Sequence, residues 1–96
     1  MKTEESLIME IEKWTKKIKA ELENIESYGN KGREFLTNIK AYVSDSAHFL
    51  EKGDLVRSFE AIIWAWSWLE IGTDLEYLKK EYVDIKQLGK NFNPSG

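Results

Sequence analysis

Apolar side chains recur at steps of three and four residues over the first part of the chain, the spacing of one face of an α-helix. The members of this row are Leu7, Ile11, Trp14, Ile18, Leu22 and Ile25. Thr3 and Ser6 lie shortly before Leu7, the first member of this row, and either side chain can cap a helix N-terminus. Residues 27–32 then gather glycine, asparagine and serine, so we predict that the first helix ends there in a loop.

A second apolar row predicts a helix from about Arg33 to Lys52. Its members are Phe35, Ile39, Tyr42, Val43, Phe49 and Leu50. Gly53 follows as a C-terminal stop, and Asp54 comes directly after it as an N-cap for a third helix. The sequence therefore predicts a tight antiparallel hairpin of the second and third helices around Gly53 and Asp54.

The third helix is predicted from Leu55 to about Lys80, with Gly72 as a weak point where it could bend or end early. Glycine in a helix interior costs up to about 1 kcal/mol relative to alanine. After Tyr82 the helical periodicity fades. We therefore predict one domain over residues 1–82 and a mobile C-terminal tail over residues 83–96.

This third helix is apolar on nearly all sides when its residues are placed at roughly 100° each. The arc expected to face the core contains Leu55, Val56, Phe59, Ile62, Ile63, Trp66 and Leu69. A second apolar arc contains Ala61, Trp64, Ala65, Trp68, Ile71 and Leu75. Only narrow polar seams, at Glu60, Ser67 and Glu70, separate the two arcs.

Two interpretations of the second arc stay open. The third helix could be the central element of the bundle and bury both arcs against its neighbours. Alternatively, Trp64, Trp68 and Ile71 form an exposed face, with Ala61 and Ala65 as shallow ground beside them, that binds a second copy of the chain or another protein. Because one broad arc is enough for a three-helix bundle, the surplus arc predicts a homodimer.

Composition supports a single all-α domain, an antiparallel three-helix bundle. The 96 residues are 42% hydrophobic, with four Trp, four Tyr and four Phe, which is enough for one core. The polar start is unlike a signal peptide, and the longest apolar run, residues 61–66, is far below the roughly 20 residues of a membrane helix. We therefore expect a cytoplasmic protein without a membrane partner. Abundant Lys, Glu and Ile beside a single Gln are typical of a thermophile.

The sequence lacks the residue sets of the common catalytic and metal sites. It has no Cys, which excludes disulfides, thiolate metal sites and a cysteine nucleophile. His48, the only His, lies on the polar side of the second helix and is expected to be a surface residue. There is no Gly-rich phosphate loop, no Ser/His/Asp set and no Glu-x-x-His pair. We predict no catalytic residues, no metal and no cofactor, and hence no enzyme.

One alternative function stays open, namely a domain that binds a small ligand or nucleic acid. Asp45 lies at the border of the second helix's apolar row, where it could form a polar site with Tyr42. Two Lys clusters could contact phosphate, and their members are Lys13, Lys16, Lys17 and Lys19, and Lys79, Lys80, Lys86 and Lys90. Glu residues surround the first cluster, however, and the net charge of -3 argues against a nucleic-acid partner.

The hairpin also resembles a known family. The segments that carry the likeness are Tyr42 to Asp45, Phe49 to Asp54, Ser58 to Ala61 and Trp64 to Gly72, about a third of the chain. They are similar to the archaeal family named domain of unknown function three-five-seven. The resemblance implies a short helical bundle from an archaeon and no assigned activity.

Individual positions agree with the family pattern or depart from it. The matching positions are Tyr42, Asp45, Gly53, Asp54, Ala65, Trp68, Leu69 and Gly72. The chain departs from the pattern at Ser46 for Ala, Trp64 for Tyr, Ser67 for Gly and Glu70 for Asp. If the family's Gly and Asp lined a ligand site, Ser67 and Glu70 would alter that site here.

Overall fold

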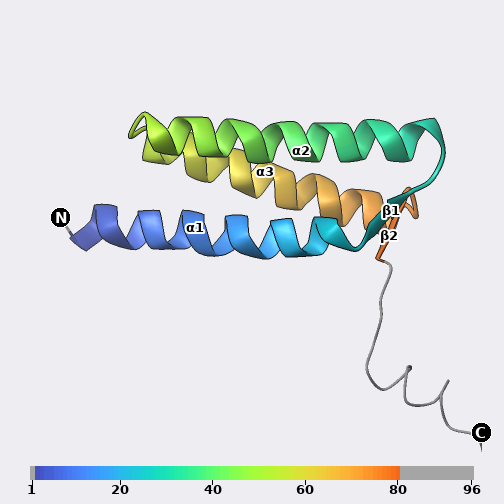
Figure 1. Cartoon of the computed structure of the whole chain (residues 1–96), viewed down its shortest axis with the longest axis horizontal. Helices are drawn as coiled ribbons and strands as arrows, with labels where there is room; N and C mark the ends of the chain where they lie inside the picture. Colours follow the sequence, from blue (N-terminus) through green and yellow to red (C-terminus); the bar gives the residue numbers. More distant parts are fainter. Residues whose placement is uncertain (1, 81–96) are drawn as a thin grey trace, which may run out of the picture.

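The computed structural model of the protein describes residues 2–80, which form three helices and two short strands (Figure 1). The helices are α1 (Lys2–Glu23), α2 (Gly29–Glu51) and α3 (Leu55–Asp74), and the strands are β1 (Ile25–Ser27) and β2 (Leu78–Lys80). Helix α3 lies between α1 and α2 and contacts both (Figure 1). The predicted three-helix bundle is thus confirmed, and its third helix is the central element.

The predicted hairpin between α2 and α3 is confirmed at its turn. Gly53 has a φ of 77°, in the left-handed region that glycine adopts without a Cβ penalty. The amide of Gly53 donates to the Leu50 carbonyl at 3.0 Å. The Asp54 carboxylate accepts from the Arg57 amide at 3.2 Å and so caps α3.

The loop predicted at residues 27–32 is wrong, because α2 already begins at Gly29 and residues 25–27 form a strand. Strand β1 pairs with β2 in antiparallel register, with Ile25 opposite Lys80 and Ser27 opposite Leu78. Beyond the pair, the Tyr28 amide donates to the Tyr77 carbonyl at 2.9 Å. The backbone groups of this connection are therefore satisfied by a distant segment, which local periodicity does not indicate.

Helix α3 is shorter than predicted and ends at Asp74 instead of Lys80. The chain reverses at Glu76, whose φ is 64°, and Leu78 then folds back onto the helices with 0% of its surface exposed. A Cβ on Gly72 would lie 2.7 Å from Leu78 Cδ1. Gly72 therefore makes room for this returning segment. The predicted tail, residues 83–96, lies outside the described residues.

The predicted core face of the third helix is only partly right, since Val56 and Ile63 are 64% and 40% exposed. The buried positions of α3 are Ser58, Ala61, Ile62, Ala65, Leu69 and Gly72. Most of these residues are small, and Ser58 contacts the α2 backbone through its hydroxyl at Ser46. Small side chains let two helices approach closely, so the sector that faces α2 is less hydrophobic than its flanks.

The hydrophobic core combines all three helices with β2. Its buried members are Ile18, Ile39, Val43, Ile62, Ala65, Leu69 and Leu78. Among the helices of residues 2–80, none is apolar over enough of its length to cross a lipid bilayer.

Candidate interaction face of the third helix

The outer face of α3 is the side turned away from Ala65 and the core. Its large apolar residues are Val56, Ile63, Trp64 and Ile71, and Leu75 at the C-cap extends it. These side chains are 40–64% exposed. Elsewhere in the described residues, the large hydrophobic side chains with such exposure are Met9 and Tyr28. Exposed apolar surface is therefore concentrated along one helix.

The structure divides the residues that the sequence suggested for a partner face. Trp64 and Ile71 are exposed, whereas Ala61 and Ala65 are buried inside the chain. Trp68 packs inward, with its ring edge-to-face on Phe35 at a centroid distance of 4.9 Å. The exposed face is thus displaced around the helix, from Ala61 and Ala65 towards Val56 and Ile63. Sequence reasoning missed these two residues because both apolar arcs are similarly hydrophobic.

Trp64 stands beside a shallow depression in the outer face. The Ser67 depression has a volume of about 350 Å³ and is lined by Phe59, Glu60, Ile63, Trp64 and Ser67. The Ser67 hydroxyl donates to the Ile63 carbonyl at 3.0 Å, so its hydrogen-bonding capacity is partly used within the helix. The Trp64 ring stacks on Tyr42 of α2, with centroids 6.4 Å apart and planes inclined by 21°. An exposed indole next to an apolar hollow suits contact with another apolar surface.

A second hollow lies beside the last turns of α3. This acidic hollow has a volume of about 340 Å³ and is lined by Trp66, Leu69, Glu70, Thr73, Asp74 and Lys80. Lys80 is held by Glu21 of α1, with Nζ–O distances of 3.0 and 3.1 Å. Glu70 and Asp74 are exposed and form no ion pair with any residue of the described part. The hollow therefore combines the Trp66 ring with two carboxylates that form no ion pair within residues 2–80.

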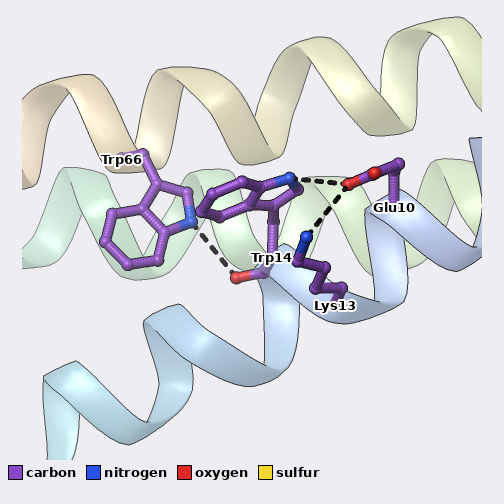
Figure 2. A network of polar contacts seen from close by, with 4 residues as sticks. All are labelled: Glu10, Lys13, Trp14 and Trp66. Carbon is purple, nitrogen blue, oxygen red and sulfur yellow. Dashed lines mark hydrogen bonds and ion pairs between the residues drawn. The ribbon is translucent and has the colours of Figure 1, made fainter.

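The Trp66 ring, which forms the aromatic side of this hollow, is held by a hydrogen bond to α1 (Figure 2). Trp66 Nε1 donates to the Trp14 carbonyl at 3.1 Å. The two rings meet edge-to-face, with centroids 5.7 Å apart and planes at 83°. Trp14 Nε1 in turn donates to the Glu10 carboxylate at 2.9 Å. Both indole N–H groups are thus satisfied, which fixes the two rings.

Two residues of the first Lys cluster, Lys13 and Lys17, lie near the Trp14 ring. Lys13 Nζ and Lys17 Nζ lie 5.3 and 4.9 Å from the Trp14 ring centre, within cation–π range. Lys13 also lies 4.0 Å from the Glu10 carboxylate (Figure 2). The cluster is therefore partly neutralised by its own helix.

The polar site suggested at Tyr42 and Asp45 is not assembled within the described residues. Tyr42 lies against Trp64, and Asp45 is exposed without a hydrogen bond or ion pair to any described residue. His48 is exposed, as predicted, and its ring is tilted against Phe49. Over residues 2–80, no three His, Asp or Glu side chains are placed to hold a metal ion together.

Arg57 is a residue that sequence reasoning left without a role. It is the only cationic residue of α3, in the first turn, and its side chain is 69% exposed. Its guanidinium is 3.6 Å from the Asp54 carboxylate and lies over the Phe49 ring at 5.9 Å. The other charged residues of α3 are Glu60, Glu70 and Asp74. In the sequence, Asp54 and Glu60 flank Arg57 at three residues on either side, so acidic residues accompany its charge.

Comparison with known proteins places this helical architecture in context. A model of the family described as protein of unknown function, DUF357, matches residues 11–78. The crystal structure of protein AF1782 from Archaeoglobus fulgidus, a DUF357 protein, is similar to this chain, with a TM-score of 0.74 and 47% sequence identity. The similarity covers 81% of this chain and 97% of that one. No curated protein matches. The outer face of α3 lies within the matched residues.

Proposed function

Because this chain belongs to DUF357, a family of proteins of unknown function, we propose from its own surface that it is a non-catalytic interaction module that self-associates through the outer face of α3. The observation that carries this proposal is the row of exposed apolar side chains from Val56 to Leu75. Exposed apolar side chains that gather along one face of a protein often mark an interaction site. Removing apolar surface from water is favourable by about 25 cal/mol for each Å² buried.

A second copy of the chain suits this face in shape and chemistry. The face runs along a helix of 20 residues, which is about 30 Å long. It offers both a projecting indole, Trp64, and the apolar Ser67 depression that can receive one. A two-fold pair uses the same patch on both subunits, so a face that contains both parts is self-complementary.

The non-catalytic part of the proposal rests on composition and on the outer face itself. The chain has no Cys, and its single His is exposed and belongs to no Ser/His/Asp set recognisable in the sequence. Carboxylates beside the face are exposed to water. They suit recognition of a cation or a basic rim better than acid–base chemistry.

Nucleic-acid binding is the second candidate function, and the Lys13–Trp14–Lys17 cluster is the observation that favours it. Proteins that bind single strands combine cations with aromatic rings on which bases stack. The net charge of -3 and the pairing of Lys13 with Glu10 weaken this candidate. A gel shift on RNA and DNA over a salt series tests it, since phosphate contacts give a steep salt dependence.

Sedimentation equilibrium and light scattering over a concentration series test self-association. We expect the parent chain to form dimers and Trp64→Glu to be a folded monomer, with helical circular dichroism retained, because Trp64 is exposed in the single chain. Met9→Glu is the matched control, since it adds the same charge at an exposed apolar residue of α1 and should stay dimeric. A parent chain that remains monomeric at high concentration would refute the proposal.

A further inference from the structure

We propose that residues 85–92 of this chain dock into its own acidic hollow, with their lysines at Glu70 and Asp74 and their apolar side chains against Trp66. The hollow lies on the α1 side of α3, where Lys80 is paired with Glu21. It shares no residue with the outer face of α3. The docking is therefore independent of the self-association proposed above.

The C-terminal segment begins at the hollow. Lys80 is both the last residue that the structure describes and part of the lining of the hollow. The five steps from Lys80 to Ile85 span at most about 17 Å when extended, so the segment is tied close to this surface. A short connection makes docking an intramolecular event with a high effective concentration. Contacts that are weak between separate molecules are therefore enough to seat the segment.

The composition of residues 85–92 complements the hollow. The segment reads Ile-Lys-Gln-Leu-Gly-Lys-Asn-Phe, with two Lys, three large apolar residues and no acidic residue. The acidic residues that follow Lys80 are Glu81 and Asp84, and both come before this segment. Residues 85–92 are therefore both cationic and apolar.

The hollow offers a surface for each kind of side chain. Glu70 and Asp74, one turn apart on α3, are exposed and form no ion pair within residues 2–80. Lys80, the cation in the lining, is already paired with Glu21. The Trp66 ring, held by its hydrogen bond to α1, supplies an apolar surface beside the two carboxylates. The lysines and the apolar side chains of the segment each find a matching surface here.

The apolar content after Lys80 argues against the mobile tail expected from the sequence. Five of the twelve residues in 81–92 are large and apolar, namely Tyr82, Val83, Ile85, Leu88 and Phe92. Segments that stay disordered are usually poor in such residues and rich in charge. The family match ends at residue 78, so the segment follows the matched part of the chain. The acidic hollow borders the point where it begins.

Disulfide trapping in the full chain tests the docking, because a chain without native Cys carries only the two introduced thiols. Thr73→Cys lies in the hollow and Gln87→Cys in the segment, so every proposed contact residue is kept. Thr37→Cys with Gln87→Cys is the matched control, because Thr37 is exposed and lines a hollow on α2. We expect the first pair to close an intramolecular disulfide at least about tenfold faster than the control pair.

The rates are measured by mass spectrometry at low protein concentration, after circular dichroism has established that each reduced variant is folded. Equal rates for the two pairs would show a tail that visits both sides of the bundle alike, and would overturn the proposal. A disulfide that joins two chains in place of one that closes within a chain would overturn it as well, because the segment would then occupy the hollow of another copy.

Charge reversal tests the role of the two carboxylates in the same trapping pair. Lys86→Glu with Lys90→Glu should slow trapping by about fivefold or more, because four acidic groups then face one another. Adding Glu70→Lys with Asp74→Lys should return the rate to within about twofold of the parent pair. A rate that stays unchanged after reversal in the segment would show that Glu70 and Asp74 do not hold it, and the proposed seating would be wrong.

Two controls separate this docking from other effects. Lys40→Glu with Lys52→Glu makes the same charge change at exposed residues on the α2 side and should leave the trapping rate unchanged. Trp64→Glu should also leave it unchanged, because Trp64 does not line the acidic hollow. If Trp64→Glu abolishes dimers while the two Cys pairs close equally fast, self-association stands and the docking is wrong. If dimers persist in Trp64→Glu while the hollow pair closes faster, the docking stands and the proposed interface is wrong.

Discussion

Ser46 of α2 and Ser58 of α3 each donate a hydroxyl hydrogen bond to the other's backbone carbonyl, at 2.8 and 2.7 Å. The two hydroxyl oxygens are 3.1 Å apart, and both residues are fully buried. This reciprocal pair joins the two helices of the hairpin.

Removal of these hydroxyls gives the first prediction. Ser46→Ala and Ser58→Ala should each lower the free energy of unfolding by about 0.5–1.5 kcal/mol, the net contribution of a hydrogen bond, measured by urea denaturation. The effects should not add in the double variant, because both residues belong to one network. Ser44→Ala, at an exposed position of α2, is the control. Additive losses would show that the two bonds act independently.

The hairpin turn gives the second prediction. Gly53→Val should destabilise the domain by more than about 1 kcal/mol, because a β-branched residue is strained at a φ of 77°. A Cβ there meets nothing within 4 Å, so the loss would report backbone strain alone. Asp54→Ala should cost about 0.5–2 kcal/mol through the lost cap. Parent-like melting of both variants would contradict this reading of the turn.

The contact between Gly72 and Leu78 gives the third prediction. Gly72→Ala should destabilise by about 1–3 kcal/mol, although alanine is the better helix former, because its Cβ would meet Leu78 and Phe35 at 2.7 and 3.0 Å. Leu78→Ala alone should cost about 2–5 kcal/mol through the cavity that it leaves. In the double variant the clash is relieved, so chemical denaturation should show a loss smaller than the sum of the two.

The hydrogen bond from Trp66 to the Trp14 carbonyl of α1 gives the fourth prediction. Trp66→Phe keeps an aromatic ring but removes the donor to the Trp14 carbonyl, and should cost about 1 kcal/mol in thermal unfolding. Trp64→Phe, made at the exposed indole, should change the stability of the single chain by less than about 0.5 kcal/mol. Equal losses from the two variants would mean that the indole N–H of Trp66 contributes nothing.

The hairpin was predictable from sequence because its determinants are local. Gly53 and Asp54 set the end of one helix and the start of the next through their own backbone and side chain. The strand pair was not predictable in this way. Each strand has three residues, and the partner of Ile25 is Lys80, far along the chain. For the same reason the early end of α3 near Gly72 could only be left open, because it depends on the tertiary contact of Gly72 with Leu78 of β2.

The exposed apolar side chains lie on the helix that the sequence indicated, but partly on another side of it. Trp64 and Ile71 are exposed as the partner hypothesis requires, whereas Ala61 and Ala65 face the interior. A prediction from hydrophobicity places Val56 and Ile63 in the core. It gives small residues such as Ala no preference for the core. The close approach of α2, visible in the Ser46–Ser58 contact, decides which arc is inside. How closely the two helices approach depends on the volumes of the side chains between them. The hydrophobic periodicity of a single helix does not contain this information.

The placement of α3 between α1 and α2 has a consequence for the order in which the domain assembles. The α2–α3 hairpin is made of neighbours in sequence, so its contacts close a short loop and cost little chain entropy. Helix α1 joins through residues such as Trp14 and Trp66, which are 52 positions apart, and through the β1–β2 pair. Partial unfolding should therefore release α1 first and leave the hairpin as a residual unit, with faster amide hydrogen exchange in α1 than in the centre of α3.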